Sequence, residues 1–148
     1  MWYHICYHMR RVVLDTNVLV SALRSRRGAS NRLLGLLGSG RVELVISVPL
    51  MLEYEYALSS MLKDLVYSES EVNEIIDFIC AASEHQLIYY LWRPFLKDPR
   101  DDHVLEVAVA GSCEAILTYN TRDFRRVEQF GLQVLTPREF LKQIGEIR

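Results

Sequence analysis

The sequence lacks the features that define several large classes of protein. No apolar run in its 148 residues reaches the length of about 20 residues that a membrane-spanning helix needs, so we expect no membrane segment. The net charge of −2 shows no excess of one sign, which predicts no overall attraction to nucleic acid. Binding of a polyanion would therefore need a local basic patch or a bound metal. Internal repeats, low-complexity tracts and linkers are also missing.

Cysteine is scarce. The three cysteines, Cys6, Cys80 and Cys113, are odd in number and have no paired spacing, which argues against a disulfide framework or a zinc site. They are typical of reduced thiols in a cytoplasmic protein, and we expect two of them in the core. Half of the residues are hydrophobic and 24% are charged, which is the balance of a folded globular protein.

The N-terminal residues differ from the rest of the chain. The start "MWYHICYHMR" lacks the basic beginning, apolar middle and small-residue end of a signal peptide. We interpret residues 1–8 as a disordered or non-native extension and residues 9–148 as a single domain that opens with a strand. His4 and His8 lie four residues apart, but a flexible tail explains them better than a metal site.

Short apolar runs alternate with helical patterns along the chain. The runs show no clean in–out alternation, which is typical of strands covered on both faces, and they span Val12–Leu14, Leu44–Ile46, Leu87–Tyr89, Ala115–Thr118 and Gln133–Leu135. Each helical pattern between them has a recognisable start, at Ser30, Pro49, Ser68 with Glu71, Asp98-Pro99 and Thr136-Pro137. Gly38-Ser39-Gly40 is expected to end the first of these helices. This alternation predicts an α/β fold with helices on both faces of a mostly parallel, five-stranded sheet.

Acidic and amide side chains follow the strands of this predicted sheet. In open α/β sheets, ligands bind where strands end and the next helices begin. The residues placed at that edge are Asp15, Glu53, Asp98, Asp101, Asp102, Asn120 and Asp123. Clustered carboxylates repel one another and resist burial unless some are protonated or a cation lies among them. Oxygen ligands without histidine or cysteine suit Mg²⁺ or Mn²⁺.

Each of these residues also has a simpler explanation. Asp15 could cap the following helix, and Glu53 could be a surface residue, although it borders an apolar stripe. Asp98, Asp101 and Asp102 are all in places where Asp commonly caps a helix, and the local pattern does not choose between Asp101 and Asp102. Glu106, four residues after Asp102, lies on the same helix face and could assist the site, but we favour a solvated residue.

Four motifs, taken in order, resemble the PIN domain family of metal-dependent ribonucleases, in particular its VapC-like toxin branch. The motifs are "VVLDTNVLVSAL" (12–23), "VISVPLMLEYEYAL" (45–58), "DPRDDHVLEVAVAG" (98–111) and "LTYNTRDF" (117–124). The resemblance covers nearly everything from Met9 onward. It implies a three-layer α/β/α, Rossmann-like PIN fold that uses acids to hold Mg²⁺ or Mn²⁺.

Transferred residue by residue, the resemblance implies a specific site. Its first acid falls on Asp15, with Thr16 and Asn17 as supporting polar positions; its second falls on Glu53, and its third on Asp102. The fourth family acid falls on Asn120, where this sequence departs, because an amide carries no charge. Asp123 could supply that charge. The resemblance thus makes Asp15, Glu53 and Asp102 the catalytic residues, and the departure puts a second metal ion in doubt.

Function follows from the resemblance in the same way. It implies cleavage of RNA phosphodiester bonds by a metal-activated water, in a toxin of a toxin–antitoxin pair. Its partners would be a cognate antitoxin and a second copy of the chain, with residues 50–61 and 72–79 as the candidate self-interface or as plain core. The alternative is a PIN-fold module that binds RNA or protein without cutting. A haloacid-dehalogenase-like phosphatase would also have an Asp at the end of its first strand. It would normally have a second Asp two residues later, where this sequence has Asn17, so we do not favour this alternative.

Basic residues flank the acid motifs and are candidates for contacts to phosphate. An ordinary charged surface explains any single one of them, whereas three clusters beside three acid motifs favour binding of RNA. Aromatic residues near them can stack on unpaired bases, although packing is the better explanation for Trp92. The RNA-binding candidates are Arg24, Arg26, Arg27, Arg100, Tyr119 and Arg122.

Overall fold

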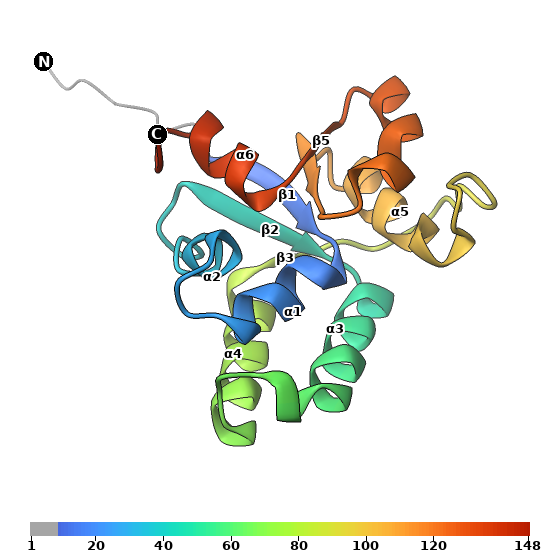
Figure 1. Cartoon of the computed structure of the whole chain (residues 1–148). Helices are drawn as coiled ribbons and strands as arrows, with labels where there is room; N and C mark the ends of the chain where they lie inside the picture. The colour runs from blue at the N-terminus through green and yellow to red at the C-terminus, as the bar shows by residue number, and fades with distance from the viewer. Residues whose placement is uncertain (1–8) are drawn as a thin grey trace, which may run out of the picture.

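Five parallel strands form the centre of the molecule (Figure 1). The computed structural model describes residues 9–148, so the predicted extension of residues 1–8, with His4, Cys6 and His8, lies outside the described residues. The strands are β1 (Arg10–Leu14), β2 (Val42–Ile46), β3 (Glu84–His85), β4 (Ala115–Leu117) and β5 (Gln133–Leu135). Their order across the sheet is β3-β2-β1-β4-β5, and every neighbouring pair is parallel. The sheet is therefore wholly parallel, where the sequence predicted a mostly parallel one.

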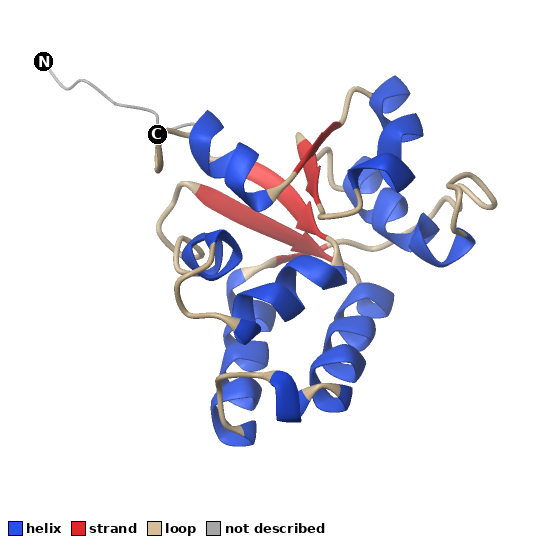
Figure 2. Ribbon diagram, in the orientation of Figure 1, coloured by secondary structure: helices blue, strands red, loops and turns tan. Residues whose placement is uncertain are grey.

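Helices connect the strands, as parallel pairing requires. The α-helices are α1 (Thr16–Arg24), α2 (Ala29–Leu34), α3 (Val48–Ser60), α4 (Glu69–Ala82), α5 (Asp102–Ala110) and α6 (Pro137–Gln143). Short 3₁₀ helices occupy η1 (Leu62–Asp64), η2 (Pro99–Asp101) and η3 (Thr121–Phe130). The predicted capping box of Ser68 and Glu71 starts α4, and a second one starts α6 at Thr136. Figure 2 shows α1 to α4 on one side of the sheet and α5 with η3 on the other, so the three-layer α/β/α fold is confirmed.

Strand order reverses beside β1. The chain steps outward from β1 to β2 and β3, and then returns to place β4 on the opposite side of β1. The carboxyl ends of β1 and β4 flank this reversal, which is where open α/β sheets bind their ligands.

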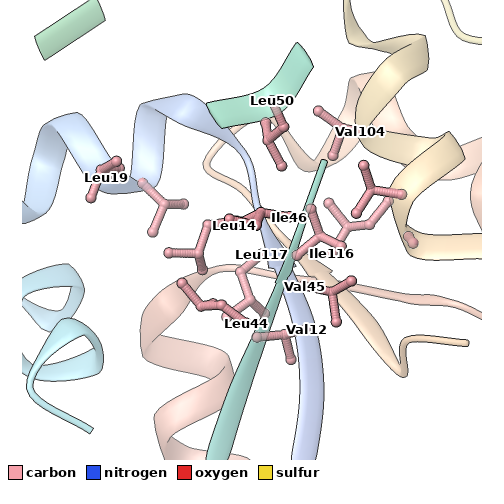
Figure 3. Close-up of a cluster of buried hydrophobic side chains, with 14 of the residues drawn as sticks. Val12, Leu14, Leu19, Leu44, Val45, Ile46, Leu50, Val104, Ile116 and Leu117 are labelled. Carbon is pink, nitrogen blue, oxygen red and sulfur yellow. The ribbon is translucent and has the colours of Figure 1, made fainter. Parts of the chain in front are cut away.

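The core fills both faces of the central strands (Figure 3). Val12 and Val13 of β1 point to opposite faces, and both are completely buried. Leu50 of α3 packs against the cluster from one side of the sheet and Val104 of α5 from the other. Burial on both faces explains why these strands show no alternation of apolar and polar residues in the sequence.

The predicted strand at Leu87–Tyr89 is wrong. The third strand lies earlier, at Glu84–His85, and its ladder with β2 ends where the Gln86 amide donates to the Ile46 carbonyl at 2.8 Å. Beyond that point β2 has ended, so the apolar segment has no strand to pair with. Leu87 and Tyr89 are instead exposed, at 65% and 87%.

Two further boundaries differ from the sequence prediction. The helix expected to start at Ser30 begins at Ala29 after an N-cap at Gly28, and it ends at Leu34 rather than at the glycines of 38–40. The helical segment η3 was not predicted at all. Its apolar residues Phe124, Val127 and Phe130 recur every third residue, which is the period of a 3₁₀ helix, whereas the sequence prediction looked for the longer period of an α-helix.

The candidate self-interface is divided between core and surface. Tyr54 and Leu58 of α3 are buried in the core, whereas Leu52 and Tyr56 on the same helix are exposed, at 59% and 77%. Within residues 9–148, no helix combines the length and the apolar character needed to cross a membrane.

Candidate functional site

Asp15 is held by two hydrogen bonds at the end of β1. It is the N-cap of α1, and its Oδ1 accepts from the Thr16 amide at 2.9 Å. Its Oδ2 accepts from the Thr118 hydroxyl, at the end of β4, at 2.7 Å. Asp15 is only 7% exposed, and burial raises the pKa of its carboxyl although both hydrogen bonds oppose that rise. A carboxylate held in this way at the strand reversal is suited to contact a cation.

Glu53 reaches the same place from α3. Its Oε2 accepts from the Thr16 hydroxyl and lies 3.4 Å from Nε2 of His103. The contact with His103 is the main cause that lowers the pKa of Glu53. The neighbouring Tyr54 is fully buried and donates its hydroxyl proton to the Leu14 carbonyl, which fixes α3 against the end of β1.

His103 is a site residue that the sequence analysis missed. It lies on the first turn of α5, and its Nδ1 is buried without a hydrogen-bond partner. Its approach to Glu53 depends on the packing of α3 against α5, which no local pattern of the sequence indicates.

Asp101 shares the electrostatic environment of Asp15 and Glu53. Its pKa rises to about 6, first because the side chain is partly desolvated and then because of the nearby charges of Asp15, Asp98, Glu53 and Asp123. These groups lie on segments far apart in the sequence. Asp101 is therefore influenced by negative charges from several segments at the carboxyl edge of the sheet.

The carboxylate of Asp102 points toward the loop of residues 92–96. The residue is completely buried, and its Oδ1 accepts from the Leu96 amide at 2.8 Å, with the Phe95 amide 3.3 Å from Oδ2. One helical turn later, Glu106 accepts from the Trp92 amide at 2.9 Å and from Arg93 Nη2 at 2.9 Å. The prediction of a solvated Glu106 is wrong, because its exposed fraction is 2%. Both acids hold the loop of residues 92–96 against α5.

Asn120 and Asp123 follow β4 on the other side of the site. The backbone amide of Asn120 donates to the Thr118 hydroxyl at 3.0 Å, so one hydroxyl joins the backbone of Asn120 to the carboxylate of Asp15. Tyr119, Asn120 and Asp123 line an open cavity of about 290 Å³ together with Thr121 and Arg122. Asn17 supports this segment, since its Oδ1 accepts from the Tyr119 amide at 3.3 Å.

The basic candidates fall into two groups. Arg100 contributes to the charge environment of Glu53, and Arg122 lines the cavity with Asp123, so both lie beside the acids. Arg24, Arg26 and Arg27 lie at or beyond the far end of α1, roughly 12 Å from its start at 1.5 Å per residue. Arg26 also stacks on Tyr67, with its guanidinium 4.1 Å from the ring centroid.

The donor set fits a hard divalent cation. Asp15, Glu53 and Asp101 offer carboxylate oxygens from three segments, and like charge among them favours a cation. Within residues 9–148, no three side chains of His, Cys, Asp or Glu are arranged to hold an ion by themselves. Carboxylate oxygens without a cysteine ligand are typical of Mg²⁺ and Mn²⁺ sites, in which one or two carboxylates act together with waters and substrate phosphates.

Comparisons with known proteins identify a family and a shared fold. A family model described as PIN domain matches residues 11–122. Eleven chains of solved structures match, among them one from the crystal structure of VapBC2 from Rickettsia felis bound to a DNA fragment from their promoter. That chain is 18% identical, with a TM-score of 0.58, and the match covers 84% of this chain and 96% of the other. At this identity the likeness shows a shared fold. No curated protein sequence matches the chain.

Proposed function

This chain belongs to the PIN domain family, and from that premise we propose that it is a metal-dependent ribonuclease. The observation that carries the proposal is the position of Asp15, which is buried at the strand reversal and joined by hydrogen bonds to both Thr16 and Thr118. The substrate is RNA, and the reaction is hydrolysis of a phosphodiester bond, in which water adds to phosphorus and one P–O bond breaks.

Asp15, Glu53 and Asp101 would hold the Mg²⁺ or Mn²⁺ ion, with Asn120 and Asp123 beside them. A bound divalent ion activates water and neutralises charge that develops on the phosphodiester. Glu53 remains ionised because its pKa is lowered, so it can accept a hydrogen bond from the attacking water and orient it. Arg100 and Arg122 would bind phosphates on either side.

Asp102, which the family motif designates as the third acid, has a different role in this proposal. Its carboxylate already accepts hydrogen bonds from the loop of residues 92–96. It is a positioning residue that fixes this loop, and Asp101 supplies the third charge.

The experiment is an RNA cleavage assay with Mn²⁺ on matched variants. Asp15→Asn and Glu53→Gln should each reduce the cleavage rate at least 100-fold. Glu55→Gln is the control, because Glu55 lies two residues away on the same helix but is exposed to solvent. Equal rates for Asp15→Asn and the unchanged protein would exclude this site.

The biological setting we propose is that of a toxin paired with an antitoxin protein. The chain shares its fold with a chain of the VapBC2 complex. The exposed Leu52 and Tyr56 of α3 support a homodimer or contact with a partner protein. Co-expression with the product of an adjacent gene should suppress cleavage, and light scattering of the purified protein would report a dimer.

Two observations favour a second function. Asn120 replaces a charged family position, and within residues 9–148 no three side chains of His, Cys, Asp or Glu are arranged to hold an ion. It is a PIN-fold module that binds RNA or protein without cutting. Calorimetric titration separates the two functions, because a pure binding module does not need to take up Mn²⁺ whereas the nuclease does.

A further inference from the structure

We infer that His103 is a positioning residue that fixes the carboxylate of Glu53 and leaves one of its two oxygens for the cation. The inference rests on the proposed function, in which Glu53 helps to hold Mg²⁺ or Mn²⁺, and it adds the side chain that orients this ligand. The two residues come from different helices. His103 lies on the first turn of α5, and Glu53 lies on α3.

Two side chains contact the same oxygen of Glu53. Oε2 accepts a hydrogen bond from the hydroxyl of Thr16 at the start of α1, and Nε2 of His103 lies 3.4 Å from that oxygen. Within residues 9–148, no group donates a hydrogen bond to the other oxygen, Oε1. Because both contacts are made to Oε2, Oε1 is the oxygen that remains for a cation.

The surroundings of the imidazole ring decide which of its nitrogens carries the proton. Nδ1 is buried and has no hydrogen-bond partner among the described residues, whereas Nε2 faces the carboxylate of Glu53. A proton on Nδ1 would have no acceptor and would turn the lone pair of Nε2 toward a carboxylate, which is unfavourable. A neutral ring therefore carries its proton on Nε2, where the proton points to Oε2 of Glu53.

The two side chains differ in burial as this role requires. The side chain of His103 is 16% exposed, whereas that of Glu53 is 38% exposed and keeps contact with solvent. The residue before His103, Asp102, is completely buried and accepts a hydrogen bond from the Leu96 amide, which fixes the start of α5. A partner that orients a metal ligand typically contributes roughly 10–100-fold to metal affinity. The alternative is a purely structural contact between α3 and α5.

The test measures Mn²⁺ binding by calorimetry rather than cleavage. His103→Leu removes the donor, and we expect Mn²⁺ affinity to fall about 10-fold. The amide nitrogen of His103→Gln takes about the place of Nε2, so this variant should regain most of the affinity. The amide nitrogen of His103→Asn takes about the place of Nδ1, so this variant should bind as weakly as His103→Leu. His85→Leu, which replaces an exposed histidine of β3, is the control and should bind like the unaltered protein.

A double-mutant cycle separates positioning from a structural contact. If His103 acts through Glu53, His103→Leu should have no further effect on Mn²⁺ affinity in a protein that already carries Glu53→Gln. A general distortion of the site would instead lower the affinity by the same factor in both backgrounds. Urea unfolding of each variant shows that the proteins compared are folded.

The outcomes distinguish this inference from the proposed function. If His103→Leu binds Mn²⁺ as tightly as the unaltered protein, or lowers the affinity equally in both backgrounds, the positioning role is excluded. The nuclease proposal then stands on the Asp15→Asn cleavage assay. If the unaltered protein binds Mn²⁺ with the expected dependence on His103 but never cleaves RNA, the nuclease proposal fails and the positioning role stands. Equal affinities of His103→Gln and His103→Asn would overturn the assignment of the proton to Nε2.

Discussion

The hydroxyl of Thr118 donates to the carboxylate of Asp15 at 2.7 Å, and this bond connects the ends of β4 and β1 across the strand reversal. The same hydroxyl accepts a hydrogen bond from the backbone amide of Asn120 at 3.0 Å. One small side chain therefore sets the orientation of the first acid and of the loop that carries the fourth family position.

Replacement of Thr118 by Val should weaken metal binding without a change in side-chain volume. The substitution removes the hydrogen bond that opposes the raised pKa of Asp15, so this pKa should rise further and the carboxylate should lose its fixed orientation. We expect Mn²⁺ affinity to fall about 10-fold, as is typical when a ligand loses its supporting hydrogen bond. Calorimetry measures this, with Thr136→Val, which removes the hydroxyl that caps α6, as the matched control. An Mn²⁺ affinity of Thr118→Val equal to that of the unaltered protein would contradict the role of Thr118.

Substitution by Asn should affect mainly Mn²⁺ binding at Asp101 and mainly stability at Asp102. Asp101→Asn removes a charge beside Asp15 and Glu53, and we expect Mn²⁺ affinity to fall at least 10-fold with little loss of stability. Asp102→Asn weakens the bonds that hold the Phe95 and Leu96 amides, and it should lower the free energy of unfolding by about 1–3 kcal/mol. Calorimetry and urea unfolding on both variants decide the assignment, and the reverse pattern would return the third ligand to Asp102.

The raised pKa of Asp101 predicts a specific dependence on pH. Its pKa is about 6 in the folded protein against an ordinary value of 3.8, so the folded state binds the proton more tightly than the unfolded chain. This contribution to stability is present below about pH 4 and is lost as the pH rises through 6. Asp101→Asn should therefore be more stable than the unaltered protein at pH 7.5, on the order of 1 kcal/mol, and this advantage should disappear near pH 4.

Urea unfolding at both pH values measures that difference, with Asp77→Asn on the exposed face of α4 as the control. Metal binding should follow the same titration, because the cation competes with the proton. Mn²⁺ affinity should rise between pH 5 and pH 6.5 and then level off. An affinity that stays constant over this range would contradict the placement of Asp101 at the metal.

Glu106 should matter for stability more than for chemistry. Glu106→Ala leaves the Trp92 amide without its acceptor and Arg93 without its ion pair. We expect the free energy of unfolding to fall by about 1–3 kcal/mol, measured by the midpoint of urea unfolding, while Mn²⁺ affinity changes less than 3-fold. Glu55→Ala, at an exposed position, should leave the midpoint unchanged. A full loss of metal binding with unchanged stability would make Glu106 a ligand instead.

Much of the fold could be predicted from local patterns. Val12–Leu14, Leu44–Ile46 and the capping box at Ser68 are short-range signals that the structure confirms. The strand expected at Leu87–Tyr89 could not be corrected from the sequence, since pairing depends on where β2 ends and not on the apolar residues themselves. Strand formation is decided by the partner as much as by propensity.

The sequence indicates which segments carry the site residues, but not which side chain of each segment faces the site. Asp15 and Glu53 stand out because each is a polar residue bordering an apolar pattern. The choice between Asp101 and Asp102 depends on which carboxylate faces the loop of residues 92–96, a tertiary contact with no periodic signal. His103 was missed for the same reason, because only the packing of α3 against α5 brings it to Glu53.

The most direct test of the metal site is anomalous diffraction from a crystal soaked in Mn²⁺. We expect an anomalous peak between the carboxylates of Asp15, Glu53 and Asp101, and no such peak in a crystal of Asp15→Asn. A soaked crystal with no manganese at this edge of the sheet, or with manganese bound only elsewhere, would contradict the central claim that these acids converge on one divalent ion.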